Sequence, residues 1–124
     1  MMTTNHKSMP DERTAITHKF TVGGHKGYVT AGLYKEGGVG EVFIVMSKTG
    51  SSMAGLLDCF SIAVSTGLQH GVPLKRFVDK FKTQRFEPAG FTGHPEIKQA
   101  TSVVDYVFQW LELRFLEEEA NDKV

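Results

Sequence analysis

Histidine and cysteine are the residues whose chemistry could make this chain catalytic or metal-binding. The 124-residue sequence has one cysteine, Cys59, and five histidines: His6, His18, His25, His70 and His94. No two histidines have the four-residue spacing of a helical metal site, and no acidic pair accompanies them. A site built from His18, His25 and His94 would need the fold to bring them together, and solvated or hydrogen-bonded histidines are the simpler interpretation. We predict no catalytic, cofactor-binding or metal-binding residue and no cofactor.

Two glycine-rich turns could bind an anion through backbone N–H groups. Residues 23–27, Gly-Gly-His-Lys-Gly, could present Lys26 to a phosphate, but they match no phosphate-binding consensus and lead into no helix. A hairpin connection is therefore favoured there. Residues 48–52, Lys-Thr-Gly-Ser-Ser, lead into a helix start and are the better anion candidate. Helix capping by Ser51 or Ser52 explains that turn without a ligand.

Residues 83–96 break every hydrophobic period and contain two prolines and two glycines, which predicts a long structured loop. Arg85, Phe86 and Glu87 could make it a docking loop. Alternatively, Arg85 and Glu87 could pair and hold the loop together. Cys59 lies in the middle of a predicted helix, where a small buried or half-buried thiol is favoured over a nucleophile.

The elements that must position these residues are organised around a strand and a helix. The apolar run 42–46 predicts a buried strand. A long helix should follow from Ser51 or Ser52 to a stop at Gly71. Its predicted core-facing stripe consists of Met53, Leu56, Leu57, Phe60, Ala63, Val64, Gly67 and Leu68. The opposite, polar side consists of Asp58, Ser61, Ser65 and Gln69.

The remaining pattern predicts strands over 15–22 and 28–34, a turn over 35–40, a short helix over 73–82 and a last helix from Ile97 or Thr101 to Glu118. Apolar residues of the last helix cover about 220° of the helical wheel, whereas a core stripe needs little more than about 100°. Either another chain or domain covers part of this helix, or it is buried between the sheet and the other helices.

These elements predict an α+β fold, with a small antiparallel sheet of about three strands packed against two to three helices. Residues 1–13 should form a flexible N-terminal tail, 14–118 the domain and 119–124 a C-terminal tail. A formal net charge of zero gives no bulk field to attract nucleic acid or anionic membrane. No apolar run approaches the roughly 20 residues of a membrane span, and the start lacks a secretory signal. We expect a cytoplasmic protein without membrane attachment.

Several long segments resemble one known family. They are Ala15-Ile-Thr-His-Lys-Phe-Thr-Val-Gly-Gly-His-Lys-Gly-Tyr, Gly40-Glu-Val-Phe-Ile-Val-Met-Ser-Lys, Gln69-His-Gly-Val-Pro-Leu, Arg85-Phe-Glu-Pro-Ala-Gly-Phe-Thr-Gly and Ser102-Val-Val-Asp-Tyr-Val-Phe-Gln-Trp-Leu. Together they resemble the C-terminal region of class II, adenosylcobalamin-dependent ribonucleotide reductases over about residues 10–116. That region is called the TSCPD domain after a short motif. Here the motif is Thr101-Ser102-Val103-Val104-Asp105, with valines replacing its cysteine and proline, which favours a helix-start and core role over thiol chemistry.

The resemblance implies a role in deoxyribonucleotide synthesis. The family's activity is that of a ribonucleoside-diphosphate reductase, but its catalytic barrel, with the cysteines and cobalamin pocket, does not fit in 124 residues. We therefore expect a non-catalytic accessory, assembly or regulatory component that binds the catalytic chain. The candidate contacts with a partner or ligand are Arg85, Phe86, Glu87, Phe91, His94, Tyr106 and Trp110.

Two other functions remain open at this point. A nucleotide- or nucleic-acid-binding module could stack bases on Phe86, Phe91 and His94. Its cations would be Lys19, Lys26, Lys48, Lys75, Arg76, Lys80, Lys82 and Arg85. Neutral net charge and the frequency of solvated surface lysines count against it. The domain could also act on another protein partner, and a homo-oligomer is open as well.

Overall fold

The computed structural model describes residues 6–116 and confirms the α+β fold. The elements, in chain order, are β1 (Ala15–Val22), β2 (His25–Leu33), β3 (Val39–Met46), α1 (Ser51–Gln69), α2 (Leu74–Phe81), β4 (Gly90–Phe91), β5 (Gln99–Ala100), α3 (Val103–Leu111) and a π-helical turn, η1 (Glu112–Leu116). Strands β1, β2 and β3 form an antiparallel sheet in that order. The short strands β4 and β5 pair antiparallel, with Gly90 opposite Ala100.

The described chain divides into two compact units. The first contains residues 6–18 and 28–74, and the second contains residues 19–27 and 75–116. Strands β1 and β2 therefore each contribute residues to both units. The first unit also contains β3 and α1, whereas the second contains the β1–β2 turn and every element after residue 74.

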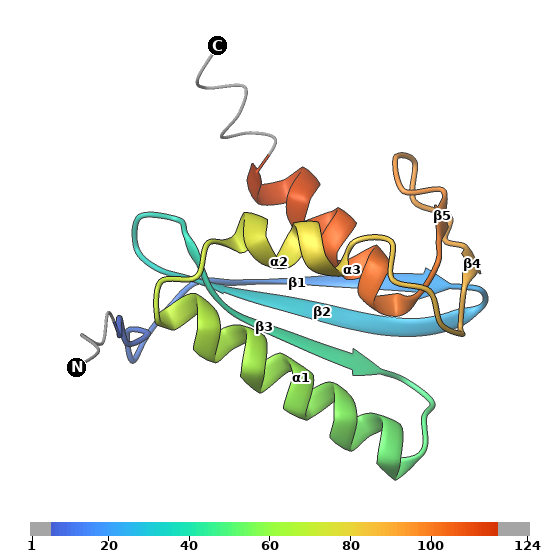
Figure 1. Ribbon diagram of the computed structural model, residues 1–124, viewed down its shortest axis with the longest axis horizontal. Helices are drawn as coiled ribbons and strands as arrows, with labels where there is room; N and C mark the ends of the chain where they lie inside the picture. Colours follow the sequence, from blue (N-terminus) through green and yellow to red (C-terminus); the bar gives the residue numbers. More distant parts are fainter. Residues whose placement is uncertain (1–5, 117–124) are drawn as a thin grey trace. The chain divides into compact units, whose positions relative to one another are not determined.

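Helix α1 runs along β3 (Figure 1), which is an edge strand of the sheet. Three side chains on α1 bond to the backbone of that strand. Ser65 Oγ accepts from Val42 N at 2.9 Å and donates to Val42 O at 3.1 Å. Ser61 Oγ accepts from Ile44 N at 3.2 Å, and Gln69 Nε2 donates to Gly40 O at 3.1 Å. The helix thus satisfies part of the exposed edge that β3 would otherwise present.

This arrangement corrects the predicted orientation of α1. Ser61 and Ser65, which we expected on the polar side, are buried against the strand. Met53 and Leu56, expected in the core, are 39% and 66% exposed. The wheel assumed that α1 packs by apolar contact alone, whereas a helix beside a strand edge also needs hydrogen-bonding side chains on its inner face.

The ends of α1 were predicted from glycine and serine signals. The stop is confirmed, because Gly71 adopts φ +93° and Val72 N donates to Gly67 O at 3.0 Å. The helix begins at Ser51 as predicted, but its cap differs from the prediction. Gly50 occupies the N-cap without a side-chain hydrogen bond, and Ser51 and Ser52 are the first two residues of the helix. Serine capping does not explain this turn.

Within residues 6–13, predicted to belong to a flexible tail, Lys7 and Arg13 bond to other residues of the first unit. Lys7 N donates to Gln69 O at 2.7 Å, and the Tyr34 hydroxyl donates to Lys7 O. Arg13 forms a two-point ion pair with the buried carboxylate of Glu41, which raises the arginine pKa through the hydrogen bond. Residues 1–5 and the predicted C-terminal tail, 119–124, lie outside the described residues.

The core of the second unit is α3. All residues of α3 except Gln109 are buried, and the Tyr106 ring stacks on Phe20 of β1 at 4.9 Å between centroids. The Phe108 ring meets Phe81 of α2 at 5.3 Å. Deep burial therefore accounts for the wide apolar arc of the last helix. The α-helical part ends at Leu111 and η1 follows, while residues 117 and 118 of the predicted helix are not described.

Candidate functional site

The seven predicted contact residues all belong to the second unit. Arg85, Phe86 and Glu87 line a shallow groove of about 480 Å³, which Gln99 and Thr101 close on the other side of the loop. All three side chains are exposed. The structure therefore brings this part of the predicted site together on the loop that connects α2 to β4.

The groove depends on a buried carboxylate, Asp105, which is 2% exposed. Its Oδ1 accepts from Thr83 N at 2.7 Å, where the chain leaves α2. Its Oδ2 accepts from Thr101 N at 2.8 Å and from Gln109 Nε2 at 2.9 Å. One side chain thus ties the residue that follows α2 and the residue that precedes Ser102 to α3, because a carboxylate can accept several N–H groups.

Thr101 and Ser102 complete this attachment. Ser102 Oγ accepts from Asp105 N at 2.9 Å, which is the N-cap hydrogen bond of α3. The hydroxyl groups of Ser102 and Thr101 both donate to Gln84 O, at 2.7 and 2.8 Å, and Phe86 N donates to Thr101 O at 3.1 Å. The predicted helix-start and core role of residues 101–105 is confirmed, since Val103 and Val104 are 3% and 7% exposed.

The clamp by Asp105 was not predicted. Its sequence signal was present, because a serine followed three residues later by an acidic residue is typical of a helix start with a reciprocal cap. Here the Asp105 side chain bonds to Thr83 N and Thr101 N instead of to the N–H group of the N-cap residue. The local sequence pattern does not distinguish these two arrangements.

His94 braces the second half of the loop. Its Nδ1 accepts from Glu96 N at 3.0 Å and from Ile97 N at 3.1 Å, so the neutral ring carries its proton on Nε2. The ring meets Tyr106 edge-on, with 6.3 Å between the centroids. His94 is therefore engaged in holding the turn, while Phe91, on β4, is 68% exposed.

The turn between β1 and β2 packs against the same loop. Gly23 N donates to Phe91 O at 3.0 Å. Gly23 has φ +55°, and a Cβ at this position would come within 2.3 Å of Ala89 O. The hairpin connection is confirmed, but the turn is Gly23 and Gly24 and residues 25–27 belong to β2. Glycine is required at position 23 by both the positive φ and this close approach.

Several candidate residues are placed differently from the prediction. Tyr106 and Trp110 are 1% and 6% exposed and belong to the interior, so a partner cannot reach them on this surface. Among residues 6–116, no ion pair joins Arg85 and Glu87, so the alternative in which these two residues pair and hold the loop together does not apply. Cys59, expected to be at least half-buried, is exposed on α1.

Burial changes the chemistry of Tyr106. Desolvation of the phenolate raises the pKa of its hydroxyl to about 12. The group is therefore neutral at physiological pH and is no candidate for a general base. Within residues 6–116, no cluster of three His, Cys, Asp or Glu side chains could hold a metal ion.

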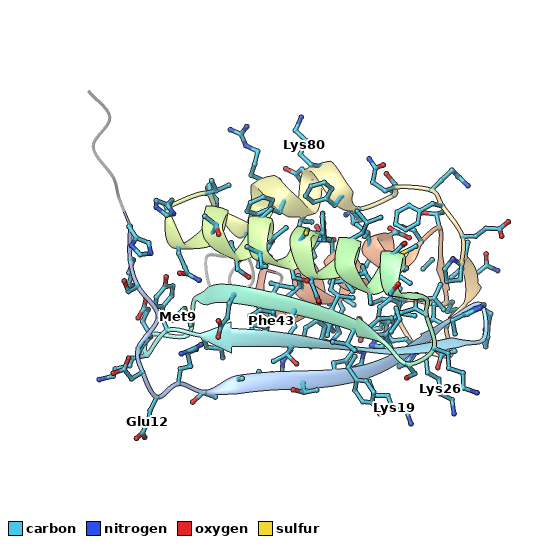
Figure 2. All side chains as sticks on the ribbon, turned by 90° about the horizontal axis from the view of Figure 1, so that it is seen from below. Met9, Glu12, Lys19, Lys26, Phe43 and Lys80 are labelled. Carbon is cyan, nitrogen blue, oxygen red and sulfur yellow. The ribbon has the colours of Figure 1, made fainter. Side chains whose placement is uncertain are left out.

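The cations of the second unit do not form one binding face. Lys19 and Lys26 project from one side of the molecule and Lys80 from the opposite side (Figure 2). Lys82 pairs with Glu112 at 2.8 Å, and Lys75 pairs with Asp79 at 2.8 Å. Lys19, Lys26 and Lys80 therefore do not lie along one track for a phosphate backbone.

Among residues 6–116, α1 alone is long and apolar enough to cross a membrane by length and composition. Length and composition alone are shared by the core helices of many water-soluble proteins. The hydrogen bonds from Ser61, Ser65 and Gln69 to β3 instead describe a helix folded onto a sheet edge.

Comparison with known proteins identifies a family and several relatives that this sequence resembles. The model of the TSCPD domain matches residues 3–115. The vitamin B12-dependent ribonucleotide reductase of Streptantibioticus cattleyicolor is 56% identical over 110 residues, which are 89% of this chain and 18% of the reductase. That of Streptomyces coelicolor is also 56% identical over 110 residues, 11% of its length, and that of Rhodopirellula baltica is 48% identical over 108 residues, 10% of its length.

The chain therefore spans less than a fifth of the length of these relatives. No solved structure matches it.

Proposed function

This chain belongs to the TSCPD domain family, and we propose that it serves a vitamin B12-dependent ribonucleotide reductase as a non-catalytic component that binds the catalytic polypeptide and supports its assembly or regulation. The observation that carries the proposal is 56% identity to a segment of reductases in which that segment is only 11–18% of the chain. The proposed process is deoxyribonucleotide synthesis, in the cytoplasm.

The use of the polar residues supports a non-catalytic role. Thr101, Ser102 and Asp105 form the motif of the family, and each is bonded to the backbone of the chain itself. A hydroxyl or carboxylate that already satisfies backbone groups in the interior is positioned to hold a loop and not to meet a substrate. These motif residues thus hold the 83–96 loop in place on α3.

The loop surface provides contacts that a partner could use. Phe86 and Phe91 are 43% and 68% exposed, and Arg85 and Glu87 flank Phe86 in the groove. Exposed aromatic and arginine side chains are enriched among the residues that dominate protein–protein binding. These four residues remain our candidate contacts, whereas Tyr106 and Trp110 act by filling the core beneath them.

The test is a binding and activity measurement with purified components. The full 124-residue chain is titrated into the catalytic polypeptide of the vitamin B12-dependent reductase from the same organism, and binding is followed by calorimetry. We expect a saturable one-to-one complex and a change in reductase turnover of at least twofold. The Phe86→Ala, Phe91→Ala double variant should weaken binding several-fold. Absence of binding at tens of micromolar, with unchanged turnover, would overturn the proposal.

A further inference from the structure

The outward side of α1 is apolar although nothing in the first unit covers it. Leu56 is 66% exposed, Ile62 is 59% exposed and Met53 is 39% exposed. Asp58 is the only charged residue among the 19 of the helix. A surface helix of a globular protein normally carries charged and polar residues opposite its buried stripe, so this side is unusual.

The adjoining strand extends the same surface. Phe43 and Val45 are 42% and 57% exposed, and they alternate along β3 with the buried residues Val42 and Ile44. Figure 2 shows Phe43 on the strand along which α1 runs. We call Met53, Leu56, Ile62, Phe43 and Val45 the α1–β3 surface. These exposed apolar residues are spread over α1 and β3, and exposed apolar surface of this kind marks interaction sites.

The hydrogen bonds to β3 fix this surface in place. Ser61, Ser65 and Gln69 recur every four residues along α1, and all three bond to the strand edge. If α1 rotated to bury Leu56 and Ile62, these bonds would be lost and buried backbone groups of β3 would be left without partners. The apolar side is therefore held outward and is preorganised for binding.

The relatives indicate which kind of molecule could cover the α1–β3 surface. In them the same domain is 9–18% of a single polypeptide, so it folds as part of a far longer chain. In the present chain, Lys7 N bonds to Gln69 O and the His6 ring stacks on His70 with 4.6 Å between centroids. Any polypeptide that precedes this segment in a relative therefore enters the domain at the C-terminal end of α1.

The composition of α1 also favours a protein over a lipid surface. Helices that lie on anionic membranes carry Lys and Arg on their polar side, and α1 has neither. Insertion across a bilayer would break the side-chain bonds to β3. A helix of this length is about 28 Å long, which suits one half of a standard protein interface.

We propose that the α1–β3 surface is the main docking surface for the catalytic polypeptide of the reductase, which covers Leu56 and Ile62 with an apolar surface of its own. This inference rests on the proposed function and adds to it the place of contact. The 83–96 loop then supplies secondary contacts.

The test compares three variants of the full chain in the calorimetric assay. Leu56→Lys with Ile62→Lys places two charges on the surface, and because both side chains are exposed, the unfolding midpoint should stay close to that of the wild type. We expect affinity for the catalytic polypeptide to fall at least tenfold. The control, Leu56→Met with Ile62→Val, keeps the surface apolar and should bind within about twofold of the wild type. Phe91→Lys, in the second unit, should cost less than the double lysine variant.

Each outcome has a distinct meaning. If the wild type does not bind, the proposed function fails. If it binds and the double lysine variant binds equally well, the docking inference is overturned while the function stands. The inference is also overturned if the lysine variant still binds the reductase normally but loses another interaction. That interaction could be a dimer of this chain, seen by sedimentation, or binding to phosphatidylglycerol vesicles, seen by flotation.

Discussion

At the scale of single residues, Asp105 has the clearest structural role, because its carboxylate accepts hydrogen bonds from backbone N–H groups on either side of a long loop. Three N–H groups from Thr83, Thr101 and Gln109 converge on its two oxygens. Loops of this length are normally mobile, so one buried acceptor on α3 fixes the start of the 83–96 loop and the segment just before α3. Three donors need acceptor oxygens at this position, and the two oxygens of aspartate supply them.

Replacement of Asp105 by asparagine should therefore be costly. Asparagine keeps the shape, but it replaces one acceptor oxygen by an NH₂ group that faces donors, and it removes the charge that strengthens the hydrogen bonds. We expect Asp105→Asn to lower the free energy of unfolding by about 2–4 kcal/mol in urea titrations. Asp79→Asn is the matched control, because Asp79 forms only an exposed pair with Lys75 on α2. It should cost less than about 0.5 kcal/mol, and equal costs would contradict the clamp.

Ionisation of Tyr106 should limit the stability of the second unit at alkaline pH. The pKa of its hydroxyl is raised to about 12 in the folded chain, from about 10 in an unfolded one. Between these values the folded state keeps the proton and the unfolded state loses it, so stability must fall as pH rises. The stabilisation is complete below pH 10, and about 2 kcal/mol should be lost by pH 12.

The measurement is the urea-unfolding free energy at several pH values from 9 to 12. Tyr106→Phe should show a shallower loss over this range, because it removes the titrating group. Tyr28→Phe removes an exposed tyrosine and should keep the wild-type slope. Identical slopes for Tyr106→Phe and the wild type would show that burial of this phenol does not control the alkaline limit.

At the scale of elements, α1 shows what a hydrophobic pattern can and cannot predict. The pattern gave the helix its length, because Gly50 and Gly71 bound it on both sides. It misplaced the helix by rotation, since Ser61 and Ser65 were assigned to solvent. Only pairing with an edge strand makes serine the better inner residue, and that pairing is a property of the sheet order and not of the helix.

Some of the other elements were also predicted from the local pattern, and others were missed. Strand β1 and helix α2 follow local alternation and a proline start, and their predicted ranges agree with the structure within one or two residues. The two-residue strands β4 and β5 were missed, because two residues carry no period. In the site, the exposure of Phe86 and Phe91 agreed with a contact role, whereas Tyr106 and Trp110 could not be separated from surface aromatics without knowing how deeply α3 is buried.

Removal of one serine tests the attachment of α1 to β3. Ser65→Ala leaves both Val42 N and Val42 O without their side-chain partner in a buried position. We expect a loss of about 1–2 kcal/mol of unfolding free energy, after allowance for the better helix propensity of alanine. Amide hydrogen exchange should quicken at Val42 and remain slow at Ile44, whose partner is Ser61.

Thr66→Ala provides the comparison for this substitution. It changes the neighbouring residue on the exposed side of the same helix and should alter stability by no more than about 0.5 kcal/mol. Exchange at Val42 should be unaffected. If both variants behave alike, the serine bonds do not hold α1 to the strand.

At the scale of the whole molecule, the two units are joined by two continuous strands. Strand β1 crosses from the first unit to the second between His18 and Lys19, and β2 returns between Gly27 and Tyr28. Domain boundaries normally fall in exposed linkers, whereas these two fall inside hydrogen-bonded strands. Unfolding of either unit must therefore disrupt strands that belong to both.

This continuity predicts a single cooperative unfolding transition. Trp110 is the only tryptophan and lies in the second unit, so its fluorescence reports that unit alone, while far-UV circular dichroism includes α1 of the first. Ser65→Ala, a change in the first unit, should lower the urea midpoint of both signals equally, and Asp105→Asn should do the same from the second. If Ser65→Ala shifted the dichroism and left the Trp110 midpoint in place, the units would unfold independently. The chain would then behave as two modules that share a sheet only in the folded state.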